Sequence, residues 1–206
     1  LRGIEKVATA NNYPMVVNST NNSIATERAI LSKLIENPTD GIIIEGTKTA
    51  LPNPNCEFYT TLSKMGIPVV FINGFYPDIS AGNVVHVITD DYGGSYSATK
   101  ELVKLGHTNI CGIFKSDDTQ GVNRYKGYID SLLHHGANVK DSNVIWFSTE
   151  TKDVLVQNIE SYISVVDKDC TSVVCYNDQI AEALIQYLDS REDTTITSVV
   201  SFDKAF

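Results

Sequence analysis

The sequence predicts an α/β fold in which parallel strands are flanked by helices. Short apolar runs of strand length, such as 42–44 and 110–114, alternate along the chain with longer segments whose apolar residues recur at helical spacing. Polar turns of a few residues separate most of these segments. This alternation is typical of doubly wound α/β proteins, in which helices connect parallel strands.

The first half of the chain divides into helices and strands at its proline, glycine and polar turns. Ser23 precedes an apolar-periodic segment and can cap a helix there, and Asn37-Pro38 ends that helix. The all-isoleucine run 42–44 is expected to be a parallel strand covered on both faces. We expect helices at 2–12, 24–36 and 91–105, a short helix that ends at Gly66, and strands at 15–17, 42–44, 67–72 and 84–88.

The second half is organised around residues 110–128. An apolar strand at 110–114 is followed by a polar turn, and Asp118 or Thr119 can cap the next helix. Arg124 lies in the first turns of that helix, roughly opposite its apolar stripe. Further strands are expected at 145–147, 173–175 and 197–202, and further helices at 154–166 and 177–190.

The pattern of elements looks the same on both sides of Gly106. We therefore expect an N-terminal subdomain at 1–105 and a C-terminal subdomain at 106–206. One continuous sheet would produce the same pattern, so this alternative stays open at the level of sequence.

Composition and charge argue against some classes of function for this chain. The net charge is −9 and no basic cluster occurs, which argues against direct contact of this chain with nucleic acid. No apolar run is long enough to cross a membrane, and the first residues of this sequence lack the apolar core of a signal peptide. Cys111 and Cys175 lie in apolar runs and are expected to be small core residues. The absence of a disulfide framework favours a reducing, cytoplasmic setting.

Sequence signatures of enzymes are missing. The segment 41–48 resembles a phosphate-binding loop, but its glycine and lysine spacing is wrong. The four histidines lack metal-ligand spacing, and we assign His134 and His135 to the end of a helix. We expect no catalytic residue, no metal and no cofactor.

Polar side chains follow the predicted strands. Because the carboxyl ends of parallel strands border the ligand crevice of such folds, these side chains could meet in one cleft. Carboxylates, amides and a guanidinium suit the paired hydroxyls of a small polyol. Polar residues also collect at strand ends as caps and turn formers, which is the structural alternative. The candidate binding residues are Glu45, Lys48, Asp91, Lys115, Arg124, Asn177 and Asp203.

Several segments resemble the effector domain of the lac/gal repressor family. The L-x-x-L-G-H element at 102–107 and the N-D-x-x-A element at 177–181 are common to that family. The loop E-G-T-K-T-A-L-P-N-P-N at 45–55 and the run D-D-T-Q-G-V-N-R at 117–124 are similar to its arabinose repressor branch in Gram-positive bacteria. The resemblance covers nearly the whole chain.

This resemblance implies a periplasmic-binding-protein-like fold of two Rossmann-like subdomains, with a sugar between them. It assigns effector contacts to Arg124, Asn177 and Asp203, and more weakly to Glu45, Lys48, Asp91 and Lys115. On that basis we expect Arg124→Ala to lose sugar binding at near-normal stability. A first strand is expected before Leu1, and a return crossover after Phe206.

The function implied is that of a sugar-sensing domain in a cytoplasmic, homodimeric repressor that responds to L-arabinose. Operator DNA would be bound by a winged-helix domain outside this chain, and no membrane contact is expected. The alternative is a periplasmic or lipid-anchored sugar-binding protein of a transporter, which would have the same fold and cleft. A sugar-processing enzyme is a third reading, but no paired acid and base supports it.

Overall fold

The computed structural model describes residues 1–79, 82–166, 168–192 and 194–203, and within them two separate parallel sheets occur. The first sheet has the order β1-β2-β3, and the second has the order β5-β4-β6-β7. All neighbouring strands are parallel, which confirms the predicted fold class. The strands are β1 (Ile42–Glu45), β2 (Val69–Ile72), β3 (Val84–Val87), β4 (Ile110–Lys115), β5 (Val144–Phe147), β6 (Ser172–Cys175) and β7 (Ser198–Ser201).

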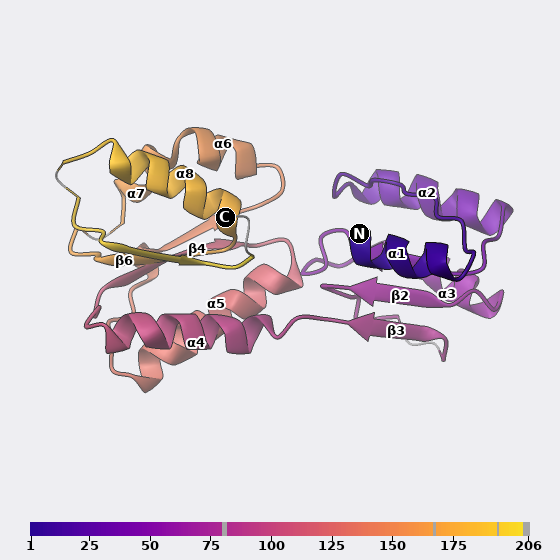
Figure 1. The fold of residues 1–206 in the computed structure, drawn as a ribbon, viewed down its shortest axis with the longest axis horizontal. Coiled ribbons are helices and arrows are strands. Elements are labelled where there is room, and N and C mark those ends of the chain that lie inside the picture. Colours follow the sequence, from indigo (N-terminus) through magenta and orange to yellow (C-terminus); the bar gives the residue numbers. More distant parts are fainter. Residues whose placement is uncertain (80–81, 167, 193, 204–206) are drawn as a thin grey trace.

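Helices cover both faces of the second sheet. Figure 1 shows α6, α7 and α8 on one face of this sheet and α4 and α5 on the other. We call the part that contains the sheet β1-β2-β3 the first body and the part that contains the sheet β5-β4-β6-β7 the second body. In the first body, the helices α1, α2 and α3 lie beside the three-stranded sheet. The helices are α1 (Arg2–Ala10), α2 (Ile24–Glu36), α3 (Cys56–Lys64), α4 (Asp91–Lys104), α5 (Thr119–His134), α6 (Lys152–Gln157), α7 (Ile159–Ile163) and α8 (Asp178–Asp189), with a 3₁₀ turn η1 (Asp141–Asn143) before β5.

The chain passes from the first body to the second between β3 and α4. Figure 1 shows α4 beside α5 in the second body, whereas the sequence pattern placed it in a subdomain ending at residue 105. Gly106 has a φ of +95° and ends this helix, so it marks a helix C-terminus instead of a linker. The structure therefore favours a division near Asp90 over the expected one at Gly106.

Each body has its own apolar core. In the first body the rings of Tyr59, Phe71 and Tyr76 contact one another, with centroids 5.2 to 5.8 Å apart. In the second body the central strands β4 and β6 are buried along almost their whole length. These strands are covered by helices on both faces, as expected for the middle of a parallel sheet.

The first sheet differs from the prediction at its outer edge. The run Met15–Val17 was expected to be a strand, but it pairs with no strand among the described residues, and Val16 is 85% exposed. β1 is therefore an edge strand, and the exposed fraction of Ile43 is 50%. The expectation that 42–44 is covered on both faces was wrong for this reason.

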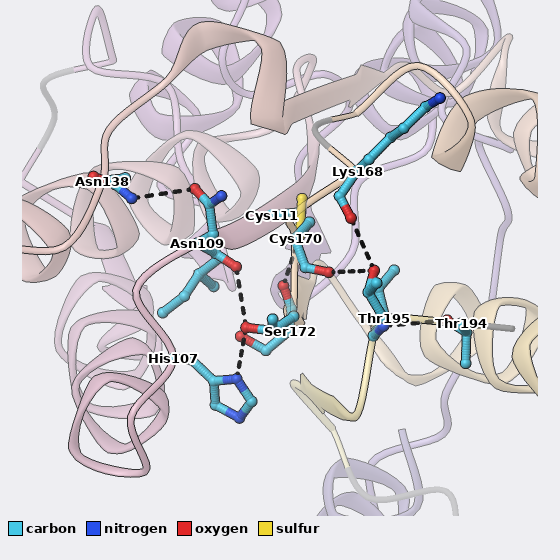
Figure 2. The surroundings of a disulfide bond; sticks show 12 residues. His107, Asn109, Cys111, Asn138, Lys168, Cys170, Ser172, Thr194 and Thr195 are labelled. Carbon is cyan, nitrogen blue, oxygen red and sulfur yellow. Dashed lines mark hydrogen bonds between the residues drawn. A yellow bond between two sulfur atoms is a disulfide. The ribbon is translucent and has the colours of Figure 1, made fainter.

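Two other predictions need correction. The helix expected at 154–166 consists of two short helices, α6 and α7, which meet at Asn158. Cys111 is a buried core residue as expected, but the sequence indicated no disulfide, whereas its sulfur is bonded to that of Cys170 (Figure 2). Both cysteines are buried, and Thr195 donates its hydroxyl to the carbonyl oxygens of Lys168 and Cys170 beside them. The spacing of 59 residues between the two cysteines gave no signal for this pairing.

Candidate functional site

A cavity of about 1570 Å³ lies mainly along the first body and reaches the second body at one end. One part of it runs along β1 and is lined by apolar side chains of α1, α2 and the exposed segment at 13–17. The other part is polar and takes its walls from loops of both bodies. The polar walls include Asn22, Glu45 and Asn73 from the first body, and Lys115, Asp118, Gln120, Thr149, Tyr176 and Asn177 from the second.

Charged groups at the end of β4 form the wall on the second body. The Lys115 ammonium nitrogen lies 3.0 Å from Asp117 Oδ1 and 2.9 Å from Asp118 Oδ2. Asp118 also accepts the hydroxyl of Tyr176 at 2.7 Å and caps α5 by accepting the Gly121 N–H. The local sequence builds this arrangement because the cap of the helix directly follows the strand.

Burial and charge act against each other in this cluster. Burial alone would lower the pKa of Lys115, but the Asp118 and Asp117 carboxylates outweigh it and raise the pKa. Burial acts to raise the pKa of Asp117, yet hydrogen bonds from Thr149 and Lys115 hold it below its usual value. Burial and the Asp118 charge raise the pKa of the Tyr176 phenol. The wall therefore presents fixed charges and a neutral phenol at neutral pH.

Arg124 lies behind this wall. Its guanidinium donates from Nε to Asp91 Oδ1 at 2.8 Å, with Nη2 also 2.8 Å from that oxygen, and Nη1 donates to the Tyr176 carbonyl oxygen. The rings of Phe202 and Tyr176 lie 4.0 and 4.8 Å from its central carbon. Burial raises the pKa of Asp91 although Arg124 opposes the shift. Neither Arg124 nor Asp91 is among the cavity-lining residues.

Three of the predicted binding residues line the cavity. They are Glu45, Lys115 and Asn177. Asn177 caps α8, because its side-chain oxygen accepts the Ile180 N–H at 3.2 Å. Glu45 accepts the Asn73 amide N–H at 3.0 Å. All three residues follow or end a strand and line the cavity, and Asn177 also caps a helix.

Two predicted residues lie elsewhere. Lys48 is absent from the cavity lining, and its ammonium is bonded to the Glu150 carboxylate of the other body. Asp203 is exposed, has a φ of +73° and is the last described residue. The structure therefore pairs Arg124 with Asp91 and places Lys115 and Asn177 on one wall of the cavity. The seven predicted residues do not all lie in one site.

Several lining residues are not among the seven predicted binding residues. Phe147 and Tyr176 present aromatic side chains at the cavity, and their rings lie 5.6 Å apart. Each stands at the end of a predicted strand, so that position was the available signal. Asn22 ends the polar turn that follows the predicted strand at 15–17, and the fold brings it to the cavity.

The described part of the chain offers no metal centre. Among these residues no group of three or more histidine, cysteine, aspartate or glutamate side chains is arranged to hold an ion. The carboxylates, amides and ammonium in the polar part of the cavity can accept hydrogen bonds from hydroxyl groups and donate hydrogen bonds to them.

A family of periplasmic binding protein domains matches residues 1–204. The chain belongs to this family. The match confirms the predicted periplasmic-binding-protein-like fold, and it agrees with a cavity whose polar walls come from two α/β bodies.

Two curated relatives are transcriptional repressors. The arabinose metabolism transcriptional repressor of Halalkalibacterium halodurans is 34% identical over 100% of this chain and 55% of its own length. The repressor of the same name from Geobacillus stearothermophilus is 35% identical over 91% of this chain and 51% of its own. The chain thus spans about half the length of these curated relatives.

Solved structures show the same fold. A transcription regulator from Staphylococcus saprophyticus superimposes with a TM-score of 0.81 over 100% of this chain and 73% of its own, at 15% identity.

Among the described residues, no helix is both long and apolar enough to cross a bilayer.

Proposed function

We propose that this chain is the effector-sensing domain of a bacterial transcriptional repressor and binds a monosaccharide between its two bodies. The observation that carries the proposal is the polar cavity, whose walls come from both bodies. A ligand in such a cavity contacts both bodies at once. It therefore binds the closed arrangement more tightly than any open one, which is the requirement for a ligand-driven switch.

The cavity chemistry fits a sugar. Glu45 accepts hydrogen bonds from hydroxyl groups, Lys115 donates, and the Asn177 amide can do both. Phe147 and Tyr176 offer apolar ring surface to the C–H face of a pyranose. We propose Glu45, Lys115 and Asn177 as contact residues on these grounds. Arg124 and Asp91 then act from behind Tyr176, by holding the wall that the sugar meets.

The proposed effector is L-arabinose. Its support is that the two repressors that are 34% and 35% identical to this chain are named for arabinose metabolism. Inverting one hydroxyl group of the sugar changes which polar groups of the cavity can form a hydrogen bond to it. Related sugars are therefore expected to bind less tightly than L-arabinose.

The proposed mechanism is allosteric release of DNA. Sugar binding favours one arrangement of the two bodies, and this arrangement repositions the operator-binding domains of a homodimer. Those domains lie outside this chain, whose net charge of −9 is unsuited to contact with DNA. The domain works in the cytoplasm and catalyses no reaction. A coupling free energy of about 1–3 kcal/mol suffices to change operator affinity roughly 5- to 150-fold.

The experiment is an operator-release titration of the full-length protein. Fluorescence anisotropy of labelled DNA from the gene's own upstream region reports binding while sugars are added. We expect L-arabinose to release the DNA, and an equal concentration of D-galactose to leave it bound. Saturable sugar binding without any effect on DNA would contradict the repressor role and favour the transporter alternative.

A further inference from the structure

Two turns meet across the rim of the cavity. The turn after β1 carries Lys48, and the turn after β5 carries Thr149 and Glu150. The Lys48 ammonium is bonded to the Glu150 carboxylate, although the two residues are 102 positions apart. The Lys48 side chain is 19% exposed, and that of Glu150 is 62% exposed. This ion pair therefore spans the two bodies at the surface of the protein.

Asn22 connects the same two turns. Its side-chain oxygen accepts the Lys48 backbone N–H at 3.0 Å, and its amide nitrogen donates to the Thr149 hydroxyl. Thr149 is held in turn on the second body, because its N–H donates to Asp117 Oδ2 at 3.0 Å. One side chain thus fixes a loop and a turn of the first body against a turn of the second.

The backbone supports a special role for this rim. Asn22 and Lys48 have φ values of +55° and +48°, in the left-handed region. Asparagine tolerates this region, whereas lysine adopts it infrequently and at a cost. Surrounding contacts must hold the Lys48 backbone there, and the hydrogen bond from its N–H to Asn22 is a contact of that kind.

We propose that Lys48, Asn22, Thr149 and Glu150 form a cross-cleft latch that stabilises the closed arrangement and so sets the affinity for the effector. The proposal rests on the proposed sugar-sensing function. In this role Lys48 is a positioning residue and not a sugar ligand. Its absence from the cavity lining, and that of Glu150, support this assignment.

The proposed latch predicts the size of the change in Kd and its dependence on salt. Apparent affinity falls in proportion to the fraction of protein that is in the binding-competent state. An ion pair as exposed as this one contributes little, so its loss is expected to raise the Kd only about two- to five-fold. The effect must also weaken at about 1 M salt, where the Debye length is about 3 Å.

The test uses the full-length protein and a matched surface pair as control. Glu150→Gln removes the charge with little change of shape, and the double variant Lys48→Glu with Glu150→Lys reverses the pair. Glu101→Gln breaks an exposed pair with Lys104 on α4 and is the control. Calorimetric titration with L-arabinose measures the Kd at low and high salt.

We expect Glu150→Gln to raise the Kd for L-arabinose at low salt but not at high salt. The variant with the reversed pair should recover most of the affinity. Glu101→Gln should leave the Kd unchanged. An unchanged Kd in Glu150→Gln, or a loss that charge reversal does not rescue, would overturn the latch.

Hydrogen–deuterium exchange of the free protein separates this proposal from the proposed function. If the wild type binds no sugar, the sensing role fails, but the latch still predicts faster exchange at 47–51 and 148–151 in Glu150→Gln than in wild type. Unchanged exchange in both segments would overturn the latch without reference to any sugar.

Discussion

At the scale of single residues, the central feature is a layer of paired charges beneath and around the cavity. Arg124 is 4% exposed and Asp91 3% exposed, and each neutralises the other. Nearer the cavity, Lys115 pairs with both Asp117 and Asp118, so this cluster keeps one net negative charge. Position in the sequence identified most of these side chains as polar groups at strand ends. Sequence position did not indicate which of these side chains pair with one another and which face the cavity. This difference depends on distances of a few ångströms between elements that are far apart in the sequence.

The burial of Arg124 changes the expected result of its removal. Arg124→Ala leaves the Asp91 carboxylate buried without its partner, which costs about 3–5 kcal/mol of unfolding free energy. The expectation of near-normal stability, drawn from the sequence, is therefore replaced. Urea denaturation measures the loss, with Arg28→Ala as the control, because Arg28 is exposed and lies over the Phe58 ring. Equal stability of the two variants would contradict a buried, charge-paired Arg124.

Asp117 gives a pH-dependent prediction. Its pKa is lower in the folded protein than its ordinary value, so its stabilising effect is fully present above the unfolded-state pKa of about 3.9 and is lost as the pH falls through the folded-state value. Asp117→Asn lacks this contribution. Urea melts from about pH 6 to about pH 3 should show the stability difference between wild type and variant shrinking. A difference that stays constant across this range would show that the carboxylate charge is not responsible.

At the scale of elements, the segment 110–128 was the part best predicted from sequence. β4, the Asp118 cap and α5 all occur where the pattern of apolar residues and the capping residue placed them. The segments at 15–17 and 154–166 were predicted less well. A strand needs a neighbour for its backbone hydrogen bonds, and a helix can break at an asparagine such as Asn158. Neither effect is visible in local composition.

The structure also gives a physical reason for the spacing of three residues between Arg124 and Gly127 on α5. Arg124 faces Asp91 at the start of α4, and one turn later Gly127 lets the two helices approach closely. A Cβ atom at residue 127 would lie 2.2 Å from the Tyr92 carbonyl oxygen and 2.9 Å from the Tyr96 nitrogen. Both are backbone atoms, so no rotation of a side chain can relieve the overlap.

We therefore expect Gly127→Ala to separate α4 from α5 and to lower the unfolding free energy by about 1–3 kcal/mol or more. Gly3→Ala in α1 is the matched control, because nothing lies within 4 Å of the added Cβ atom, and alanine favours helix. Thermal unfolding of both variants gives the comparison. A Gly127→Ala protein as stable as wild type would mean that the two helices are not packed this closely.

At the scale of the whole molecule, the two bodies touch through a small set of polar contacts. Thr119 donates its N–H to the Thr49 hydroxyl at 3.0 Å, and Gly74 leaves room there, since a Cβ atom would lie 2.7 Å from the Thr119 hydroxyl oxygen. Together with the rim contacts, these bonds border the cavity. The sequence predicted the two-body architecture through its resemblance to a known family. The pairing across the cavity could not be predicted, because its partners lie 70 to 127 residues apart.

The central claim is that the polar part of the cavity, which has walls from both bodies, binds a monosaccharide, and calorimetric titration of the full-length protein tests it most directly. L-arabinose, D-galactose, D-xylose and ribose are titrated in turn under the same conditions. The account predicts saturable binding of L-arabinose with one site per chain, and weaker or absent binding of the other three. Heat changes no larger than dilution for all four sugars would contradict it.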